Sequence, residues 1–255
     1  MVENVFRVLS ALLSAAVRDR LIPSTPATGI DLPRKAKTEI VIPTDAQVAH
    51  LIDAMPDRYR IAGELAAFAG LRQGEALGLT VDRIDFLRRT VRIDRQMVTP
   101  PAGEPSLGPP KSDASVRTIP LADGLLAALS AHLADFPTGP EGLLVTYIDG
   151  RPVRRNRFNA MWRQSGARAS LTFRYHDLRH FYASGLIDGG CSVKELQSSL
   201  GDASAKVIYD TYGHLMPTAE GRIRAASEAA YQRCALGVSS APEAKSKSAG
   251  QGVIE

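Results

Sequence analysis

Residues 172–215 constrain this chain more than any other segment, because they carry two clusters of chemically active side chains. The first cluster has the i, i+3, i+4 spacing that places three side chains on one face of a helix. The second is a tyrosine followed directly by glycine and histidine. The residues concerned are His176, Arg179, His180, Tyr212 and His214. A tyrosine that attacks phosphorus needs cations to hold the phosphate and a nearby proton acceptor, and the first cluster offers both.

Arginines are concentrated just before this segment and at its start. The 255 residues include 31 Lys and Arg against 27 Asp and Glu, and a net charge of +4 is weak support for a polyanionic partner. Residues 151–179, however, contain eight arginines, no lysine and one acid. Such a run is either a solvated helix face or a set of phosphate contacts. Arginine without lysine favours phosphate, because the guanidinium fork matches phosphate oxygens. The candidates for phosphate contact are Arg154, Arg155 and Arg157.

Composition divides the chain into four segments, which are 1–22, 23–43, 44–235 and 236–255. The first contains an amphipathic helix at 3–20, whose apolar stripe must pack on something. The second is proline-rich and aperiodic, which predicts an extended linker, and Arg34 and Lys35 within it are further candidates for phosphate contact. The third has the periodicity of a folded domain. The fourth has few apolar residues and is expected to be disordered.

Local signals in the third segment predict an α+β domain that is mostly helical, with a small antiparallel sheet. Two capping boxes and two glycines mark helix ends: Thr44 with Gln47, Ser192 with Glu195, Gly70 and Gly201. Alternating side chains predict a strand over 90–98 and a partner strand over 116–121. A last helix is expected over 217–233.

Two further basic residues stand in turns. Arg72 follows the helix end at Gly70, and Glu75 is placed three residues later, where it can pair with or orient a neighbour. Lys111 is the one lysine in the Pro/Gly-rich stretch between the two predicted strands. Each of these is either an ordinary surface residue or part of a site, and their own neighbourhood does not decide between the two.

Several classes of protein are excluded. There is no internal repeat, no Walker-type phosphate loop and no GxGxxG, so no cofactor is expected. The i, i+4 pair His176 and His180 does not predict a metal site, because Arg179 repels a cation and a third ligand is missing. The two cysteines have neither metal-ligand nor disulfide spacing, and the sequence has no signal peptide and no apolar run long enough to span a membrane. These features predict a cytoplasmic protein without a membrane partner.

The chain resembles the tyrosine recombinase (phage integrase) family in the order of its motifs, which are HDLRH, a helix of small residues, a Leu-Gly turn and Tyr-Gly-His. With the arginine of GLRQGEALGL and the lone lysine, the resemblance extends over residues 44–233. It implies a site-specific DNA recombinase that cleaves and rejoins strands through a 3′-phosphotyrosine. The covalent link conserves the energy of the phosphodiester, so the reaction needs neither ATP nor a metal.

The resemblance also implies roles for individual residues. Arg72 and Arg179 clamp the scissile phosphate, and His176 hydrogen-bonds it or accepts the tyrosine proton. Lys111 protonates the departing 5′ oxygen, and Tyr212 attacks phosphorus. The supporting residues are Glu75, His180 and His214. Tyr209 is a rival nucleophile, but Tyr212 has the neighbours and the spacing from the Leu-Gly turn that the family pattern asks for.

Asp202 departs from the family's pattern. Members usually carry histidine, sometimes tryptophan, directly after the Leu-Gly pair, and this ring donates a hydrogen bond to the phosphate. An ionised carboxylate about 4 Å from a phosphate would oppose it by roughly 4 kcal/mol at an effective dielectric near 20. Three alternatives stay open: Asp202 is protonated when DNA is bound, it turns away toward an arginine, or the enzyme is slow.

The first segment resembles only the final helix of the family's core-binding domain. This implies a truncated form that binds double-stranded DNA weakly through its catalytic face, with affinity that falls steeply with salt. By resemblance, the other partners are further protomers, in a tetramer on DNA. Two alternative functions remain. One is a catalytically impaired DNA-binding remnant of an integrase, and the other is an enzyme like type IB topoisomerases, which relax DNA by the same chemistry.

Overall fold

The structure is a computed structural model that describes residues 2–33, 41–202, 204–213, 216, 223–224 and 227–233. The chain separates into two compact units, Met1–Ile40 and Val41–Glu255. In the first unit, α1 (Val2–Arg18) has the predicted amphipathic pattern. Val5, Leu9 and Leu12 on its apolar stripe are exposed. Arg34, Lys35, His214 and the tail 236–255 lie outside the described residues. Part of the last predicted helix, over 217–233, also lies outside them, while its residues 223–224 and 227–233 are helical.

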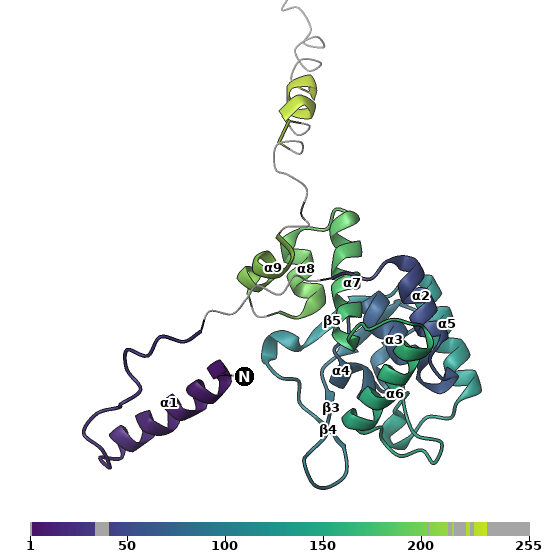
Figure 1. Cartoon of the computed structure of the whole chain (residues 1–255). Helices are drawn as coiled ribbons and strands as arrows, with labels where there is room; N and C mark the ends of the chain where they lie inside the picture. Colours follow the sequence, from purple (N-terminus) through teal and green to yellow (C-terminus); the bar gives the residue numbers. More distant parts are fainter. Residues whose placement is uncertain are drawn as a thin grey trace, which may run out of the picture. The chain divides into compact units, whose positions relative to one another are not determined.

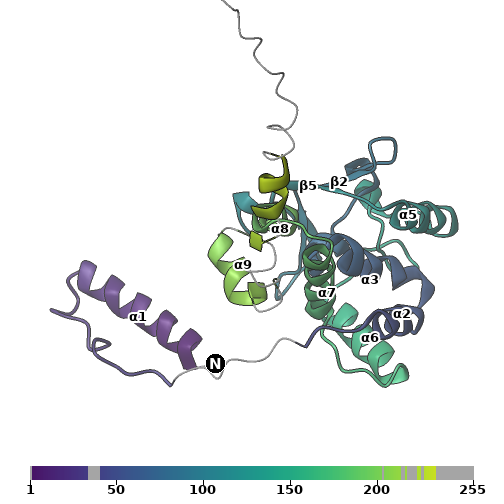
Figure 2. The same ribbon diagram turned by 90° about the horizontal axis from the view of Figure 1, so that it is seen from above.

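The second unit is mostly helical, and its described helices surround one central pair. In chain order the α-helices are α2 (Asp45–Asp53), α3 (Asp57–Ala69), α4 (Gln73–Leu77), α5 (Asp123–Asp135), α6 (Arg155–Arg168), α7 (Tyr175–Asp188), α8 (Val193–Leu200) and α9 (Ala205–Tyr212). Short 3-10 turns are η1 (Val81–Arg83), η2 (Asp113–Ser115) and η3 (Pro140–Gly142). Helices α3 and α7 pack side by side at the centre, with α2, α5 and α6 around them (Figures 1 and 2).

Two hydrophobic clusters hold this unit together, and α7 belongs to both. Its first half contributes Leu178 to the larger cluster, with α3 and the sheet. Its second half contributes Ala183 and Ile187 to a smaller cluster that contains Leu196 of α8 and Ile208 of α9. Helices α8 and α9 therefore lie beside the second half of α7, as Figures 1 and 2 show. This arrangement brings α9, which ends at Tyr212, close to α7, which carries His176, Arg179 and His180.

The predicted strand over 90–98 is wrong, because the chain forms two strands in two different sheets. Strand β2 (Thr90–Ile93) is the centre of an antiparallel sheet with β1 (Ile84–Asp85) and β5 (Arg117–Pro120). Strand β3 (Gln96–Val98) instead forms a hairpin with β4 (Ser106–Gly108). The physical reason is a close approach to the end of α4, where a Cβ on Gly78 would lie 2.4 Å from the Met97 nitrogen.

The predicted helix ends are confirmed. Both capping boxes are present, at Thr44 with Gln47 and at Ser192 with Glu195. Gly70 and Gly201 both end their helices in the left-handed conformation. At Gly201 this conformation is combined with a tight contact, because a Cβ there would lie 2.9 Å from the Arg117 side chain. The α+β, mostly helical fold with small antiparallel sheets is likewise confirmed.

Candidate active site

Arg72 is held at the start of α4 by Glu75. The Arg72 backbone nitrogen donates to Glu75 Oε2 at 2.9 Å, and Nη1 donates to Oε1 at 2.9 Å. Nη2 points the other way and donates to the Gly201 carbonyl oxygen at 3.2 Å. The predicted orienting role of Glu75 is thus matched by two contacts, and they leave one edge of the Arg72 guanidinium for a second partner.

Arg179 is buried on α7, with a side chain only 3% exposed. Its Nη1 donates to the Gly70 carbonyl oxygen at 2.6 Å, and its Nη2 donates to the Leu200 carbonyl oxygen. Desolvation lowers the pKa of Arg179 to about 10, and the nearby charge of Arg72 adds to this lowering. The guanidinium therefore stays charged at neutral pH, and it ties together the turn before Arg72 and the turn before Asp202.

Asp202 lies between these two arginines. Its Oδ1 accepts from Arg72 Nη2 at 2.7 Å and from Arg179 Nη2 at 3.1 Å. Of the three alternatives open from the sequence, the structure therefore has the carboxylate turned toward arginine. It does not turn away from the site, however, because its partners are the two arginines expected to clamp the phosphate.

Tyr212 is buried and contacts His180. The Tyr212 hydroxyl and His180 Nδ1 are 2.8 Å apart. Desolvation raises the pKa of Tyr212 to about 12, against the lowering effect of Arg179. The hydroxyl is therefore protonated at neutral pH and needs an acceptor. Desolvation lowers the pKa of His180, so this imidazole is available as a neutral acceptor. The rival Tyr209 is 57% exposed, whereas Tyr212 is 3% exposed.

The imidazole that contacts the Tyr212 hydroxyl is thus His180, which the sequence predicts as a supporting residue. The sequence predicts instead that His176 hydrogen-bonds the phosphate or accepts the tyrosine proton. His176 lies one turn earlier on α7, with its ring centroid 4.9 Å from that of His180. Desolvation lowers the pKa of His176 to about 4, and the charges of Arg179 and Arg72 contribute. His176 is therefore a neutral imidazole at physiological pH, beside the arginine pair.

Lys111 follows β4 and is not at the tip of a hairpin. It lines an open groove of about 690 Å³ together with Arg72, Gln96, Arg155, Arg174 and His176. The charged residues that line this groove, all within the described part of the chain, are basic. The groove therefore brings Lys111 to the same surface as Arg72 and His176, and it presents a positive wall of the kind that a DNA backbone fits.

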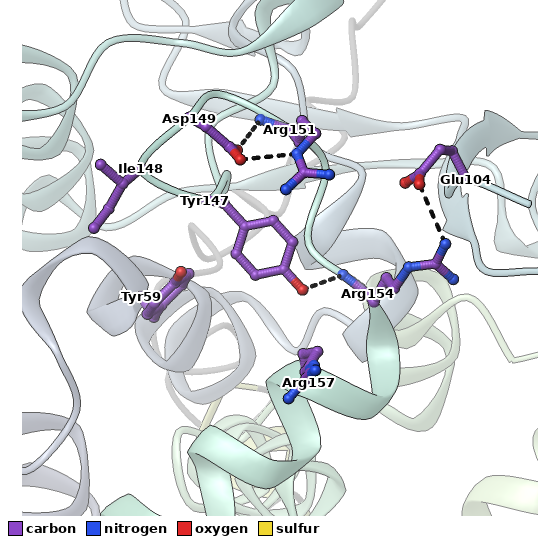
Figure 3. Close-up of a pocket in the computed structure, with 8 residues that line it drawn as sticks. All are labelled: Tyr59, Glu104, Tyr147, Ile148, Asp149, Arg151, Arg154 and Arg157. Carbon is purple, nitrogen blue, oxygen red and sulfur yellow. Dashed lines mark hydrogen bonds and ion pairs between the residues drawn. The ribbon is translucent and has the colours of Figure 1, made fainter.

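Arg154, Arg155 and Arg157, three of the residues predicted to contact DNA, do not line one surface. Arg155 lines the groove beside Arg72. Arg154 and Arg157 line a separate pocket with Tyr59 and Tyr147, which Figure 3 shows. The Arg154 guanidinium donates to the Gly103 carbonyl oxygen at 2.6 Å, so the loop between β3 and β4 already engages it. Of the three, Arg155 therefore has the position best suited to a backbone contact near the site.

Sequence reasoning missed Arg117. This residue sits on β5 and points inward, with a side chain 3% exposed, while its neighbour Val116 is exposed. Nη1 and Nη2 donate to the two oxygens of Glu75 at 3.1 and 2.8 Å, and Nε donates to the Ser199 carbonyl oxygen at 2.8 Å. Burial would raise the pKa of Glu75, but the hydrogen bond and charge of Arg117, with a contribution from Arg72, lower it below its usual value. Arg117 therefore links Glu75, which orients Arg72, to the Ser199 carbonyl oxygen just before the turn that leads to Asp202.

We expect Arg117→Met to destabilise the fold by about 3–5 kcal/mol, because it leaves the Glu75 carboxylate buried without its bidentate partner. Urea unfolding followed by the fluorescence of Trp162, the single tryptophan, measures this change. The matched control is Arg92→Met on the neighbouring strand, whose side chain is 62% exposed. That control should cost at most about 1 kcal/mol. Equal losses in the two variants would remove Arg117 from this role.

Among the described residues, no group of three or more His, Cys, Asp and Glu side chains has the arrangement of a metal site. The described helices likewise include none that is long and apolar enough to cross a membrane.

Comparison with known proteins identifies the family. The model of the phage integrase family matches residues 43–218. The chain belongs to the phage integrase family. The XerC-like tyrosine recombinase of Caldanaerobacter subterraneus subsp. tengcongensis is 26% identical over 240 residues, which cover 82% of this chain and 61% of the relative. The integrase of Salmonella phage P22 is 27% identical over 213 residues, which cover 82% of this chain and 52% of that protein. The chain thus spans only part of the length of these relatives.

Solved structures of integrases share the fold. The Tn1549 transposon integrase in complex with transposon right end DNA superposes with a TM-score of 0.76 at 20% identity, covering 90% of this chain and 79% of that one. A lambda integrase dimer bound to a COC′ core site gives a TM-score of 0.57 at 17% identity, covering 80% and 72%. The family and the fold expected from the sequence are both confirmed, whereas the roles of individual residues stay predictions.

Proposed function

We propose that the chain is the catalytic part of a site-specific DNA recombinase, which cleaves and rejoins strands of double-stranded DNA through a 3′-phosphotyrosine. The observation that supports this most directly is that Arg72 and Arg179, from separate elements, converge on one point. Near them lies the buried Tyr212, whose hydroxyl contacts the His180 imidazole. Membership of the phage integrase family supports the same function.

In the proposed reaction, Tyr212 Oη attacks phosphorus while the bond from phosphorus to the 5′ oxygen breaks. The tyrosine proton passes to His180 Nδ1, the atom that contacts the hydroxyl in the free protein, or to His176 beside it. The 5′ oxygen takes a proton from Lys111, which lies on the groove wall. Arg72 and Arg179 stabilise the charge on the non-bridging oxygens. Rejoining is the reverse, with a 5′ hydroxyl attacking the phosphotyrosine.

The partners we propose are a double-stranded DNA recombination site and further copies of the chain, assembled as a tetramer on DNA. The basic groove beside Arg72 supports the DNA partner. The Tn1549 and lambda integrases, which have the same fold, were solved with DNA, and the latter as a dimer.

Recovery of protein-linked DNA from cells tests this function. The protein is expressed, the cells are lysed in denaturant, and the DNA that stays attached to it is sequenced. We expect attached DNA that shares one sequence. Strand exchange between two labelled copies of that sequence separates a recombinase from an enzyme that only relaxes supercoils. Absence of attached DNA would favour an impaired DNA-binding remnant and would contradict the proposal.

The rate of covalent attachment should decline at a lower pH than an ordinary histidine acceptor would give. Desolvation lowers the pKa of His176 to about 4 and also lowers the pKa of His180, so His176 stays neutral between pH 8 and pH 6 and His180 keeps more of its neutral form than an ordinary histidine. The stability of the fold should fall as the pH drops from about 6.5 toward about 4, because in this window the unfolded chain binds protons that the folded His176 does not. Single-turnover rates with parallel melting curves measure this. A decline centred near the ordinary histidine value of about 6.5 would contradict it.

A further inference from the structure

The Asp202 carboxylate contacts both arginines that the proposed function assigns to the scissile phosphate. One oxygen, Oδ1, accepts from Nη2 of Arg72 and from Nη2 of Arg179. These are the charge-assisted contacts that an arginine pair makes to a phosphate oxygen. The carboxylate is 18% exposed and Arg72 is 30% exposed, so both can be reached from solvent.

Among the described residues, the cations that pair with the Asp202 carboxylate are Arg72 and Arg179. Glu75 is engaged in a bidentate pair with Arg117, and it also accepts from Arg72 Nη1. Three guanidiniums therefore share two carboxylates, and Asp202 is the one that faces Arg72 and Arg179 together. A phosphodiester carries the same single negative charge, so exchange of one anion for the other leaves the balance unchanged.

Asp202 is not needed to hold the arginines in place, because main-chain oxygens and Glu75 already do so. Arg179 donates to the carbonyl oxygens of Gly70 and Leu200. Arg72 donates to Glu75 and to the carbonyl oxygen of Gly201. When the carboxylate swings out, all of these contacts can remain, and the two Nη2 atoms become available to another anion.

We propose that Asp202 is an internal competitor of the scissile phosphate, which occupies the two-arginine site until DNA displaces it. This inference rests on the proposed function and adds regulation of the same site. At an effective dielectric near 20, a monoanion about 4 Å from the Asp202 carboxylate would bind up to roughly a thousandfold more weakly than in its absence. The two-arginine site therefore holds one anion at a time. The protein therefore engages a DNA phosphate only where other contacts along the groove offset the displacement of Asp202.

Binding of inorganic phosphate to the free protein tests this without any cleavage. The variants are Asp202→Asn, which keeps the shape and removes the charge, and Asp210→Asn as the matched control. Asp210 is an exposed aspartate on α9 that pairs with Lys206. At constant ionic strength, calorimetry should show phosphate binding to Asp202→Asn at least about tenfold tighter than to the unchanged protein. The Asp210→Asn control should match the unchanged protein, and adding Arg72→Gln to Asp202→Asn should abolish the gain.

Phosphate binding by Asp202→Asn that is unchanged or weaker would overturn the proposal, and would make Asp202 a positioning residue. Asp202→Ser serves as a second variant if the asparagine protein does not fold. Failure of both to fold would also overturn the proposal, since Asp202 would then be a structural residue. Tighter phosphate binding without any covalent DNA attachment would support the competitor and contradict the proposed function, so the two failures are distinguishable.

A second arm uses DNA whose target linkage is a neutral methylphosphonate. On ordinary DNA, Asp202→Asn should raise the rate of covalent attachment, because the phosphate no longer displaces a carboxylate. On the methylphosphonate this gain should disappear, because the linkage carries no charge with which Asp202 competes. An equal gain on both substrates would overturn competition by charge.

Discussion

Replacing Tyr212 by phenylalanine will abolish covalent attachment to DNA while leaving DNA affinity within a few-fold of the unchanged protein. The substitution deletes one oxygen and none of the cations that face the groove. Because the ring of Tyr212 packs in the smaller hydrophobic cluster with Leu196 and Ile208, phenylalanine preserves that packing. Trapping on a nicked duplex, followed by denaturing electrophoresis, measures attachment, and a filter-binding isotherm measures affinity.

The matched control is Tyr209→Phe, three residues earlier on the same helix. Tyr209 is exposed and so contributes little packing. This variant should attach to DNA at the rate of the unchanged protein. If attachment persisted in Tyr212→Phe and disappeared in Tyr209→Phe, the nucleophile would be Tyr209 and the proposed geometry would be wrong.

Replacing Lys111 by alanine should slow cleavage of ordinary DNA by roughly 10²–10⁴-fold, which is the range for loss of a general acid. On DNA whose leaving group is a 5′ thiol, the same variant should cleave at nearly the rate of the unchanged protein, because a thiolate leaves without a proton. This prediction rests on the position of Lys111, which lines the same groove as Arg72 and His176.

Lys194→Ala, an exposed lysine on α8, serves as the control for loss of one positive charge. It should leave both substrates unaffected. Equal losses by Lys111→Ala on the oxygen and sulfur substrates would assign Lys111 to DNA binding and remove it from proton transfer.

Local chemistry explains why the helix boundaries were predictable. A capping box is satisfied within four residues, so Thr44 with Gln47 and Ser192 with Glu195 depend on nothing distant. Gly70 and Gly201 end helices because glycine adopts the left-handed conformation easily. The residues of the segment 172–215 were also identifiable, since their spacing along one helix and their chemistry are both visible in the sequence.

The predictions that were wrong or missing concern features that depend on contacts between residues distant in the sequence. The bend between β2 and β3 results from the approach of β3 to Gly78, which no alternation pattern reveals. Arg117 lies inward on β5, whereas polarity alone would put Val116 inward. An arginine in a strand beside a predicted site, with a glutamate such as Glu75 elsewhere in that site, is the signal that could have suggested a buried pair.

The contacts of Asp202 and Tyr212 could not be predicted from the sequence either. The sequence shows a carboxylate where the family carries a ring donor, but not that Asp202 faces Arg72 and Arg179 together. The contact of Tyr212 with His180 depends on how α9 lies beside α7, which is set by packing in the smaller cluster. The boundaries of the domains and the role of the first helix stay predictions.

The most direct test of the central claim is to map the protein residue that carries DNA. Complexes trapped with the recovered DNA are digested with nuclease and trypsin, and the peptides are sequenced by mass spectrometry. The tryptic peptide that follows Lys206 contains both Tyr209 and Tyr212, so fragmentation assigns the linkage to one of them. We expect a nucleotide joined through its 3′ phosphate to Tyr212. A nucleotide on any other residue, or a 5′ phosphate linkage, would contradict the account.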